Sequence, residues 1–136
     1  MGVYANIQTA LDTKLNEISG SPSIAWPNTT FTVSHGTLYL EPYLLSVNQT
    51  LLTLSNYQQY DGIYQIGISV PLEQGTATLN TWVDRVNTLF ASDRELLASG
   101  DRILIKHINR GPVMRDTADR VEYYRTFVDI NFTVYS

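Results

Sequence analysis

The stretch that decides the fold is "GIYQIGISVPLEQGTATLNTWVDRVNTLF", residues 62–90. Apolar residues alternate with small or polar ones over residues 64–70, which is the period-two pattern of a strand with one buried face and one solvated face. Pro71 ends that strand. Apolar side chains then recur at helical spacing, so residues 76–90 are predicted to form an amphipathic helix. A strand that turns into a helix is therefore the predicted centre of the fold.

Gly75 lies between that strand and that helix, where phosphate-binding loops occur. A dinucleotide loop requires G-x-G-x-x-G and a P-loop requires G-x-x-x-x-G-K-[ST], whereas Gly75 stands alone and no lysine follows it. The carboxylate of Glu73 would also stand close to any bound phosphate. The sequence therefore predicts a structural turn here and no nucleotide cofactor.

A second amphipathic helix is predicted near the N-terminus, within "YANIQTALDTKLNEISG". One apolar stripe recurs at spacings of four, four and three and ends before Gly20; its members are Ile7, Leu11, Leu15 and Ile18. The two prolines of the following "SPSIAWPNTTF" limit residues 24–26 to a short edge strand at most. The first helix is thus predicted to face the core, followed by an irregular segment.

The remaining segments are predicted to be mainly extended. "TLYLEPYLLS" reads as a strand interrupted by Pro42, and "VNQTLLTLSNYQQYDG" as a further strand or extended arm before a turn at Asp61 and Gly62. Residues 103–108 and 128–134 are two further strands. The predicted class is α+β, with an antiparallel or mixed sheet, two main helices on one face, and an extended loop between the last strands. The predicted core comprises Ile66, Ile68, Val128, Ile130 and Phe132 beneath Ile7, Leu11, Leu15, Val83, Val86 and Phe90.

Composition limits the classes of protein this chain can be. Its 136 residues suit one domain over residues 1–136, and no apolar run approaches the roughly 18 residues of a membrane span. The N-terminal residues lack the pattern of a signal peptide, so we expect a soluble intracellular protein. Cysteine is absent, which excludes disulfides and thiolate metal sites. The formal net charge is −4, so nucleic-acid binding is disfavoured.

Candidate catalytic residues form no recognisable constellation. His35 and His107 have no local partner at metal-ligand spacing, and both are interpreted as structural. No G-x-S-x-G motif occurs, and scattered carboxylates define no hydrolytic pair. The tyrosine clusters, which include Tyr57 and Tyr60, suit core edges or protein interfaces better than base stacking. The sequence therefore predicts no catalytic, cofactor-binding or metal-binding residue.

The order of these segments resembles a known family over nearly the whole chain. The most specific parts are "IAWPNTTF" and "GIYQIGISVP…GT", supported by "IQTALDTKL", "LYLEPYLL", "DRILIK" and the alternating last strand. They resemble the patterns Ala-Trp-(Glu or Pro)-Asn…Phe and Gly-(Ile or Leu)-(Tyr or Phe)-Gln-(Val or Ile)…Val-Pro…Gly of small tail terminator and tail-completion proteins of long-tailed bacteriophages. These patterns are packing and turn signatures that carry no chemistry.

The resemblance implies a structural role at the head-proximal end of the virion tail, after assembly in the host cytoplasm. Family members form a homohexameric ring that caps the tail tube, stops its polymerisation and meets the head–tail connector protein. DNA only passes through the channel, where an acidic wall would not hold the phosphate backbone. The alternatives are a head-side neck or connector protein, and a small-molecule-binding or hydrolytic α+β domain. No enzymatic activity, cofactor or membrane contact is implied.

One segment lies outside the family pattern, "NRGPVMRDTADR" at residues 109–120. Residues 100–125 carry six cations against four anions, whereas residues 1–99 carry three against eight. A long connection on a rigid scaffold often carries function. It is either a solvated loop whose arginines pair with Asp116 and Asp119, or a surface that meets a neighbouring subunit or the tail tube. The candidate interface residues are Arg110, Arg115, Arg120, Tyr57 and Tyr60.

Overall fold

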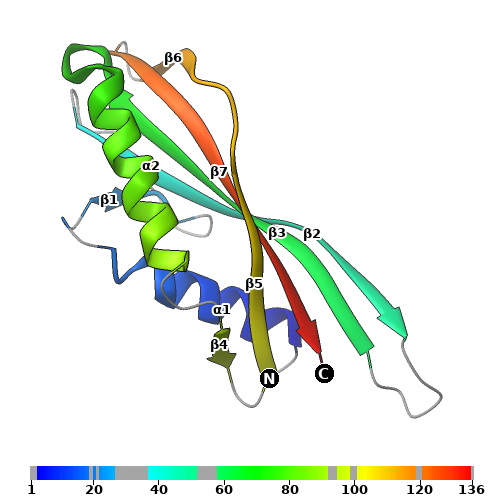
Figure 1. The fold of residues 1–136 in the computed structure, drawn as a ribbon. Helices are drawn as coiled ribbons and strands as arrows, with labels where there is room; N and C mark the ends of the chain where they lie inside the picture. The colour runs from blue at the N-terminus through cyan, green and yellow to red at the C-terminus, as the bar shows by residue number, and fades with distance from the viewer. Residues whose placement is uncertain are drawn as a thin grey trace.

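The computed structural model describes residues 3–18, 20, 22–26, 37–51, 58–91, 95–98, 101–118 and 121–135. Two α-helices, a short 3₁₀ helix and seven strands follow one another along these residues (Figure 1). In chain order they are α1 (Val3–Leu15), β1 (Ser23–Ile24), β2 (Tyr39–Leu51), β3 (Gln58–Pro71), η1 (Leu72–Gln74), α2 (Gly75–Ala91), β4 (Glu95–Ala98), β5 (Asp101–Arg110), β6 (Met114–Ala118) and β7 (Val121–Tyr135).

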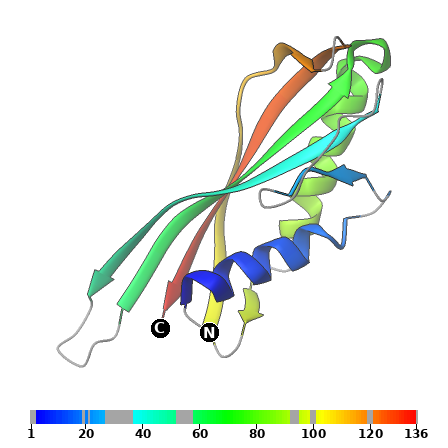
Figure 2. The same ribbon diagram turned by 180° about the vertical axis from the view of Figure 1, so that it is seen from behind.

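The strands form one mixed, strongly twisted sheet in the order β1-β2-β3-β7-β5-β4. Among the strands of the described residues, β1 and β2 pair in parallel and the other neighbours pair antiparallel. Strand β6 pairs with β7 over residues 121–125, beyond the part of β7 that β5 covers. Both helices lie on the same face of the sheet (Figures 1 and 2). The predicted α+β class is thereby confirmed.

The core lies between that face and the two helices. Alternate side chains of β3 and β7 point toward the helices, and the apolar stripes of α1 and α2 cover them. Every residue of the predicted core is buried: Ile66, Ile68, Val128, Ile130, Phe132, Ile7, Leu11, Leu15, Val83, Val86 and Phe90. Removal of these side chains from water supplies the main stabilisation of the domain.

The turn between β3 and α2 is built by backbone conformation. Pro71 is the last residue of β3, and η1 follows it directly. Gly75 has φ 77°, a region that residues with a side chain rarely adopt. A Cβ atom added at Gly75 would meet no atom within 4 Å, so glycine is required here for its backbone angles and not for a close approach. The structural reading of this turn is therefore supported, and the connection has no phosphate-binding sequence.

Two turn signals in the sequence were misread. Asp61 and Gly62 lie inside β3, where they pair with Thr133 and Phe132 of β7, so the turn predicted there is wrong. Hydrogen bonding to β7 outweighs the local preference of this dipeptide for a turn. Pro42 does not interrupt β2 either; it pairs with Ile66, which is possible because β1 covers only the start of β2 and leaves an edge at this point.

The extended loop predicted between the last strands contains a strand that the sequence reading missed. β6 continues along the same edge of β7 as β5, after an interruption at residues 111–113. Arg110 pairs with Val128 and Met114 with Arg125, so the interruption inserts one extra residue, as in a β-bulge. The amide of Gly111 donates to the carbonyl of Phe127 at 2.8 Å. Gly111 and Pro112 therefore kink an edge strand instead of opening a loop.

Candidate interaction surfaces

The sheet face that carries no helix holds an ion pair at one end. Arg125 of β7 meets Glu41 of β2 at 2.7 Å, with side chains 16% and 18% exposed. The Arg125 guanidinium lies over the ring of Phe127 at 5.0 Å, and the Tyr43 hydroxyl donates to Glu41 at 2.8 Å. That hydrogen bond is the main reason why the pKa of Tyr43 is raised. We call Glu41, Tyr43, Arg125 and Phe127 the aromatic ion-pair cluster.

Gly67 makes room for this cluster. A Cβ atom at Gly67 would lie 3.1 Å from the Phe127 ring and 3.2 Å from the Arg125 guanidinium. The sequence predicted that Gly67 and Ser69 of β3 lie on a solvated face, but both residues are buried. The aromatic ion-pair cluster covers this end of the face. Sequence reasoning missed the cluster because its members lie far apart in the chain and follow no motif.

Farther along the same face, polar side chains form a hydrogen-bonded row. The Thr133 hydroxyl donates to Asp61 at 2.5 Å and the Gln59 amide donates to the same carboxylate at 2.8 Å. The bond from Thr133 is the main cause of the lowered pKa of Asp61. Gln65 donates to Asp129 at 3.1 Å. This part of the face is polar and carries two carboxylates.

On the helix side, a tyrosine joins α1 to the sheet. The Tyr64 hydroxyl donates to Asp12 at 2.5 Å, and the Tyr64 side chain is only 1% exposed. Burial raises the pKa of Asp12, and the hydrogen bond from Tyr64 opposes that shift only in part. Burial likewise raises the pKa of Tyr64. The pair fixes α1 over β3 and is structural.

The structure separates the interface residues that the sequence predicted. Tyr60 is 8% exposed and packs edge-to-face on Tyr4, with ring centroids 5.6 Å apart, so it offers little surface of its own. Tyr57, Arg120 and His35 lie outside the described residues. Exposed His107 pairs with Asn131 on the helix-free face. Arg110 and Arg115 are both exposed and lie at one edge of the sheet.

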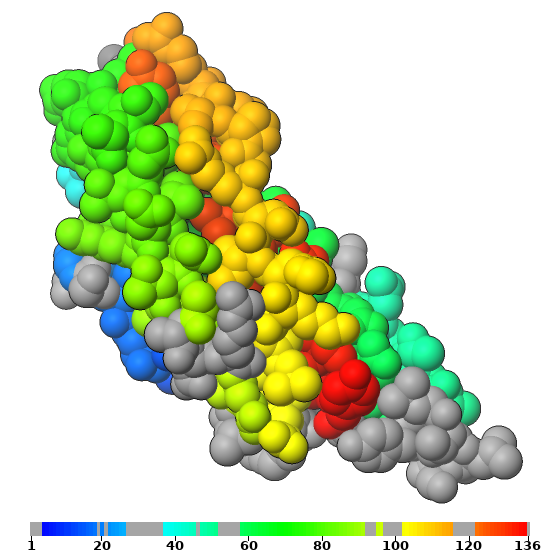
Figure 3. All heavy atoms as spheres, viewed as in Figure 1, coloured from blue at the N-terminus to red at the C-terminus, as the bar shows by residue number. Residues whose placement is uncertain are grey.

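Two exposed apolar side chains stand between those two arginines. Val113 is 36% exposed and Met114 is 43% exposed. Space-filling atoms of this segment, in orange, lie at the surface beside the green atoms of α2 (Figure 3). We call Arg110, Val113, Met114 and Arg115 the β6 edge. Arginine and methionine are enriched in protein interfaces, so this composition is typical of a contact surface.

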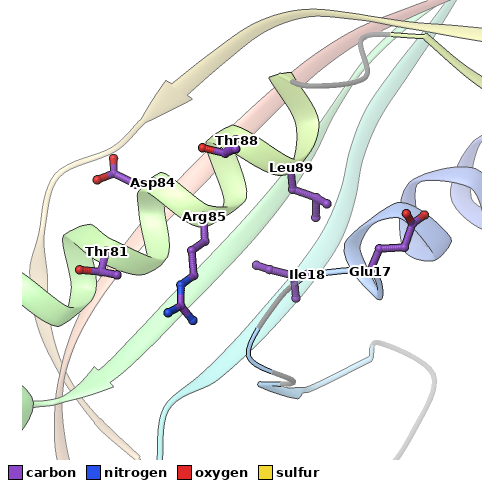
Figure 4. Close-up of a pocket in the computed structure, with 7 residues that line it drawn as sticks. All are labelled: Glu17, Ile18, Thr81, Asp84, Arg85, Thr88 and Leu89. Carbon is purple, nitrogen blue, oxygen red and sulfur yellow. The ribbon is translucent and has the colours of Figure 1, made fainter.

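A groove of about 470 Å³ lies on the other side of α2, between this helix and the end of α1 (Figure 4). Figure 4 shows Ile18, just after the end of α1, facing Arg85 and Leu89 of α2. Arg85 lies over the ring of Trp82 at 4.5 Å. We call this surface the α1–α2 groove; its lining residues are Glu17, Ile18, Thr81, Asp84, Arg85, Thr88 and Leu89. No motif in the sequence marks it.

Gly20 closes one side of this region. Its φ is 91°, and a Cβ atom there would lie 2.6 Å from the Arg85 guanidinium and 3.0 Å from the Trp82 ring. The backbone angle favours glycine, and a side chain at this position would also have to displace the end of the flexible Arg85 side chain.

Within the described part of the chain, no group of three or more His, Cys, Asp or Glu side chains could hold a metal ion. None of the described helices is long and apolar enough to cross a membrane. The features that these residues do present are an exposed sheet edge, a groove and a polar sheet face. They define a small α+β domain whose surfaces are suited to contacts with other macromolecules.

Comparison with known proteins identifies the family. The family model described as phage tail terminator protein matches residues 6–132, so the chain belongs to the phage tail terminator family. A solved structure with 20% sequence identity superposes with a TM-score of 0.74 and covers 98% of this chain and 96% of its own, which shows a shared fold. No curated protein matches. The protein is thus a structural component of a bacteriophage tail.

Proposed function

We propose that this chain forms a homohexameric ring at the head-proximal end of the tail. The ring caps the tail tube, ends its polymerisation and presents the surface that the head–tail connector protein joins. The family match over residues 6–132 is the observation that carries this proposal. The exposed β6 edge supports it, because a small cysteine-free domain with such an edge gains from packing against further subunits.

The proposed role as a terminator requires an assembly with closed symmetry. A head-to-tail interface between identical subunits either closes into a ring or continues into a fibre, and a terminator must not polymerise. Arg110 and Arg115 are the described residues that we place in contacts with the next subunit or the tube, and Arg120 and Tyr57 remain candidates. Tyr60 acts indirectly, by holding Tyr4 at the start of α1. No chemical reaction is proposed for any of these residues.

DNA passes through the ring without being bound specifically. The chain carries a formal net charge of −4, so six copies present an acidic assembly to the phosphate backbone. A channel wall of the same sign as DNA does not retain it. The row of Asp61, Gln65, Asp129 and Thr133 on the helix-free face has the polar, carboxylate-bearing character that such a wall needs.

Tail-tube assembly in the presence of the purified protein tests the proposal. Light scattering should give a mass about six times the 15.3 kDa of the chain, either for the protein alone or after tubes are added. Negative-stain images should show rings at one end of each tube, and tubes should stop lengthening. A protein that remains monomeric and leaves tube length unaffected would contradict the proposed function.

A further inference from the structure

The β6 edge and the α1–α2 groove lie on opposite sides of α2. Figure 1 places β5 and β6 on one side of this helix and the end of α1 on the other, and Figure 4 repeats that arrangement at close range. The β6 edge of one copy can therefore meet the α1–α2 groove of a second copy. The groove of the first copy and the edge of the second copy then remain free for further copies. That is the geometry of a head-to-tail contact, which can repeat around a ring.

The charges of the two surfaces are complementary. The β6 edge carries two exposed arginines, and neither Arg110 nor Arg115 forms an ion pair with another described side chain. The rim of the groove carries exposed Glu17 and Asp84. Its cation, Arg85, is held against the Trp82 ring. Carboxylates at an otherwise weakly charged rim are suited to arginine, whose planar fork donates two hydrogen bonds at once.

The apolar parts also match. Ile18 and Leu89 are apolar residues that line the groove, and Val113 and Met114 are exposed apolar residues that lie between Arg110 and Arg115 along the chain. Methionine is unbranched and flexible, so it can fill an irregular groove. Burial of exposed apolar surface supplies affinity, and the flanking charges set the register of the contact.

We propose that the β6 edge of one subunit docks into the α1–α2 groove of a second copy of this chain. Met114 and Val113 cover Ile18 and Leu89, and Arg110 and Arg115 meet the carboxylates of Glu17 and Asp84. This inference rests on the proposed ring and names the two surfaces that join its subunits. The contact weakens as salt concentration rises, because part of it is an exposed ionic interaction.

Two charge-reversed variants test the contact. The edge variant carries Arg110→Glu and Arg115→Glu, and the groove variant carries Glu17→Arg and Asp84→Arg. In each variant alone the two surfaces have the same sign, so light scattering should show loss of the ring. Circular dichroism and the thermal midpoint should show that both monomers remain folded, since all four side chains are exposed. A matched control that exchanges the partners of an exposed ion pair at the start of β5, Arg102→Glu with Glu95→Arg, should form rings as the unchanged chain does.

An equimolar mixture of the two variants gives the decisive result. In the mixture the acidic edge of one variant faces the basic groove of the other, and the basic edge faces the acidic groove. Rings in which the variants alternate should therefore reappear and regain the mass of the ring of the unchanged chain. Rings formed by either variant alone, or folded variants that form none when mixed, would overturn the inference. An unchanged chain that never forms rings, with or without tail tubes, would instead overturn the proposed function.

Discussion

Replacement of Phe132 by alanine tests the packing on which the whole domain depends. Phe132 is 1% exposed and points from β7 toward the helices, between Gly62 of β3 and Ile105 of β5. A buried phenylalanine covers on the order of 150–250 Å², and at about 25 cal/mol per Å² this corresponds to roughly 4–6 kcal/mol. Measured Phe→Ala changes in cores cost about 3–5 kcal/mol. Since Gly62 has no side chain that could fill the space, we expect a loss near 4 kcal/mol.

Urea unfolding followed by circular dichroism measures this loss as a change in midpoint at constant slope. Tyr135→Ala is the matched control, because it removes an aromatic ring from the same strand at a position 38% exposed. The control should lose less than Phe132→Ala does, since more than a third of Tyr135 stays in contact with water. If Phe132→Ala lost no more than the control, the face of β7 assigned to the core would be the wrong one.

Three further substitutions test other parts of the structure. Glu41→Gln removes the carboxylate that meets the largely buried Arg125 and should lower the free energy of unfolding by about 2–4 kcal/mol. Glu95→Gln, in an exposed ion pair, should leave the thermal midpoint unchanged. Gly75→Ala places a side chain at φ 77° and should cost about 1–3 kcal/mol in urea unfolding, and a neutral result would contradict the backbone argument. Asp12→Asn should gain stability relative to the unchanged chain as pH rises from the ordinary carboxyl pKa of 3.8 through the raised folded pKa, and the difference should stay constant above it. A difference that shrinks with rising pH would refute the assignment.

The sign of the last prediction follows from burial of the Asp12 carboxyl. Its folded pKa lies above the unfolded value, so the folded chain favours the protonated form. The unchanged chain therefore has this contribution in full below the unfolded pKa and loses it as pH rises through the folded pKa. Asparagine does not titrate and can still accept the hydrogen bond from Tyr64. The unfolding free energies of the two chains, measured between pH 3 and pH 8, separate this effect from a general acid destabilisation.

Periodic segments of the sequence predicted their structure well. The helical stripe of Ile7, Leu11 and Leu15 became α1, and the alternation after Tyr64 became the buried half of β3. In these segments local pattern and tertiary burial agree, because one face of each element lies in the same core. The predicted fold class depended on periodic segments of this kind, which explains why it was confirmed although several connections were misread.

The misread segments share a physical cause. Two dipeptides carry strong local turn signals, Asp61 with Gly62 and Gly111 with Pro112. Pairing with β7 nevertheless holds the first inside β3, and a hydrogen bond to β7 holds the second between β5 and β6. The ion pair between Glu41 and Arg125 and the α1–α2 groove left no signal at all, because each joins segments that only the folded sheet brings together. Sequence reasoning reached the β6 edge through its charge, since six cations within residues 100–125 were visible without a structure.

The edges of the sheet bear on how copies of this chain can join. Among the described strands, β1 pairs only with the start of β2 and β4 only with the start of β5, so farther along these two edges the described part of the chain supplies no partner strand. Open edges invite strand pairing between copies, which continues without limit unless it is blocked. Pro42 and the register shift after Leu45 disturb pairing along the edge formed by β2. The register shift after Ile105, the interruption at residues 111–113 and the charge of Arg110 disturb pairing along the edge formed by β5 and β6. These devices disfavour assembly by edge pairing, so a contact between side chains of the β6 edge and a preformed groove is the better route to a ring that closes.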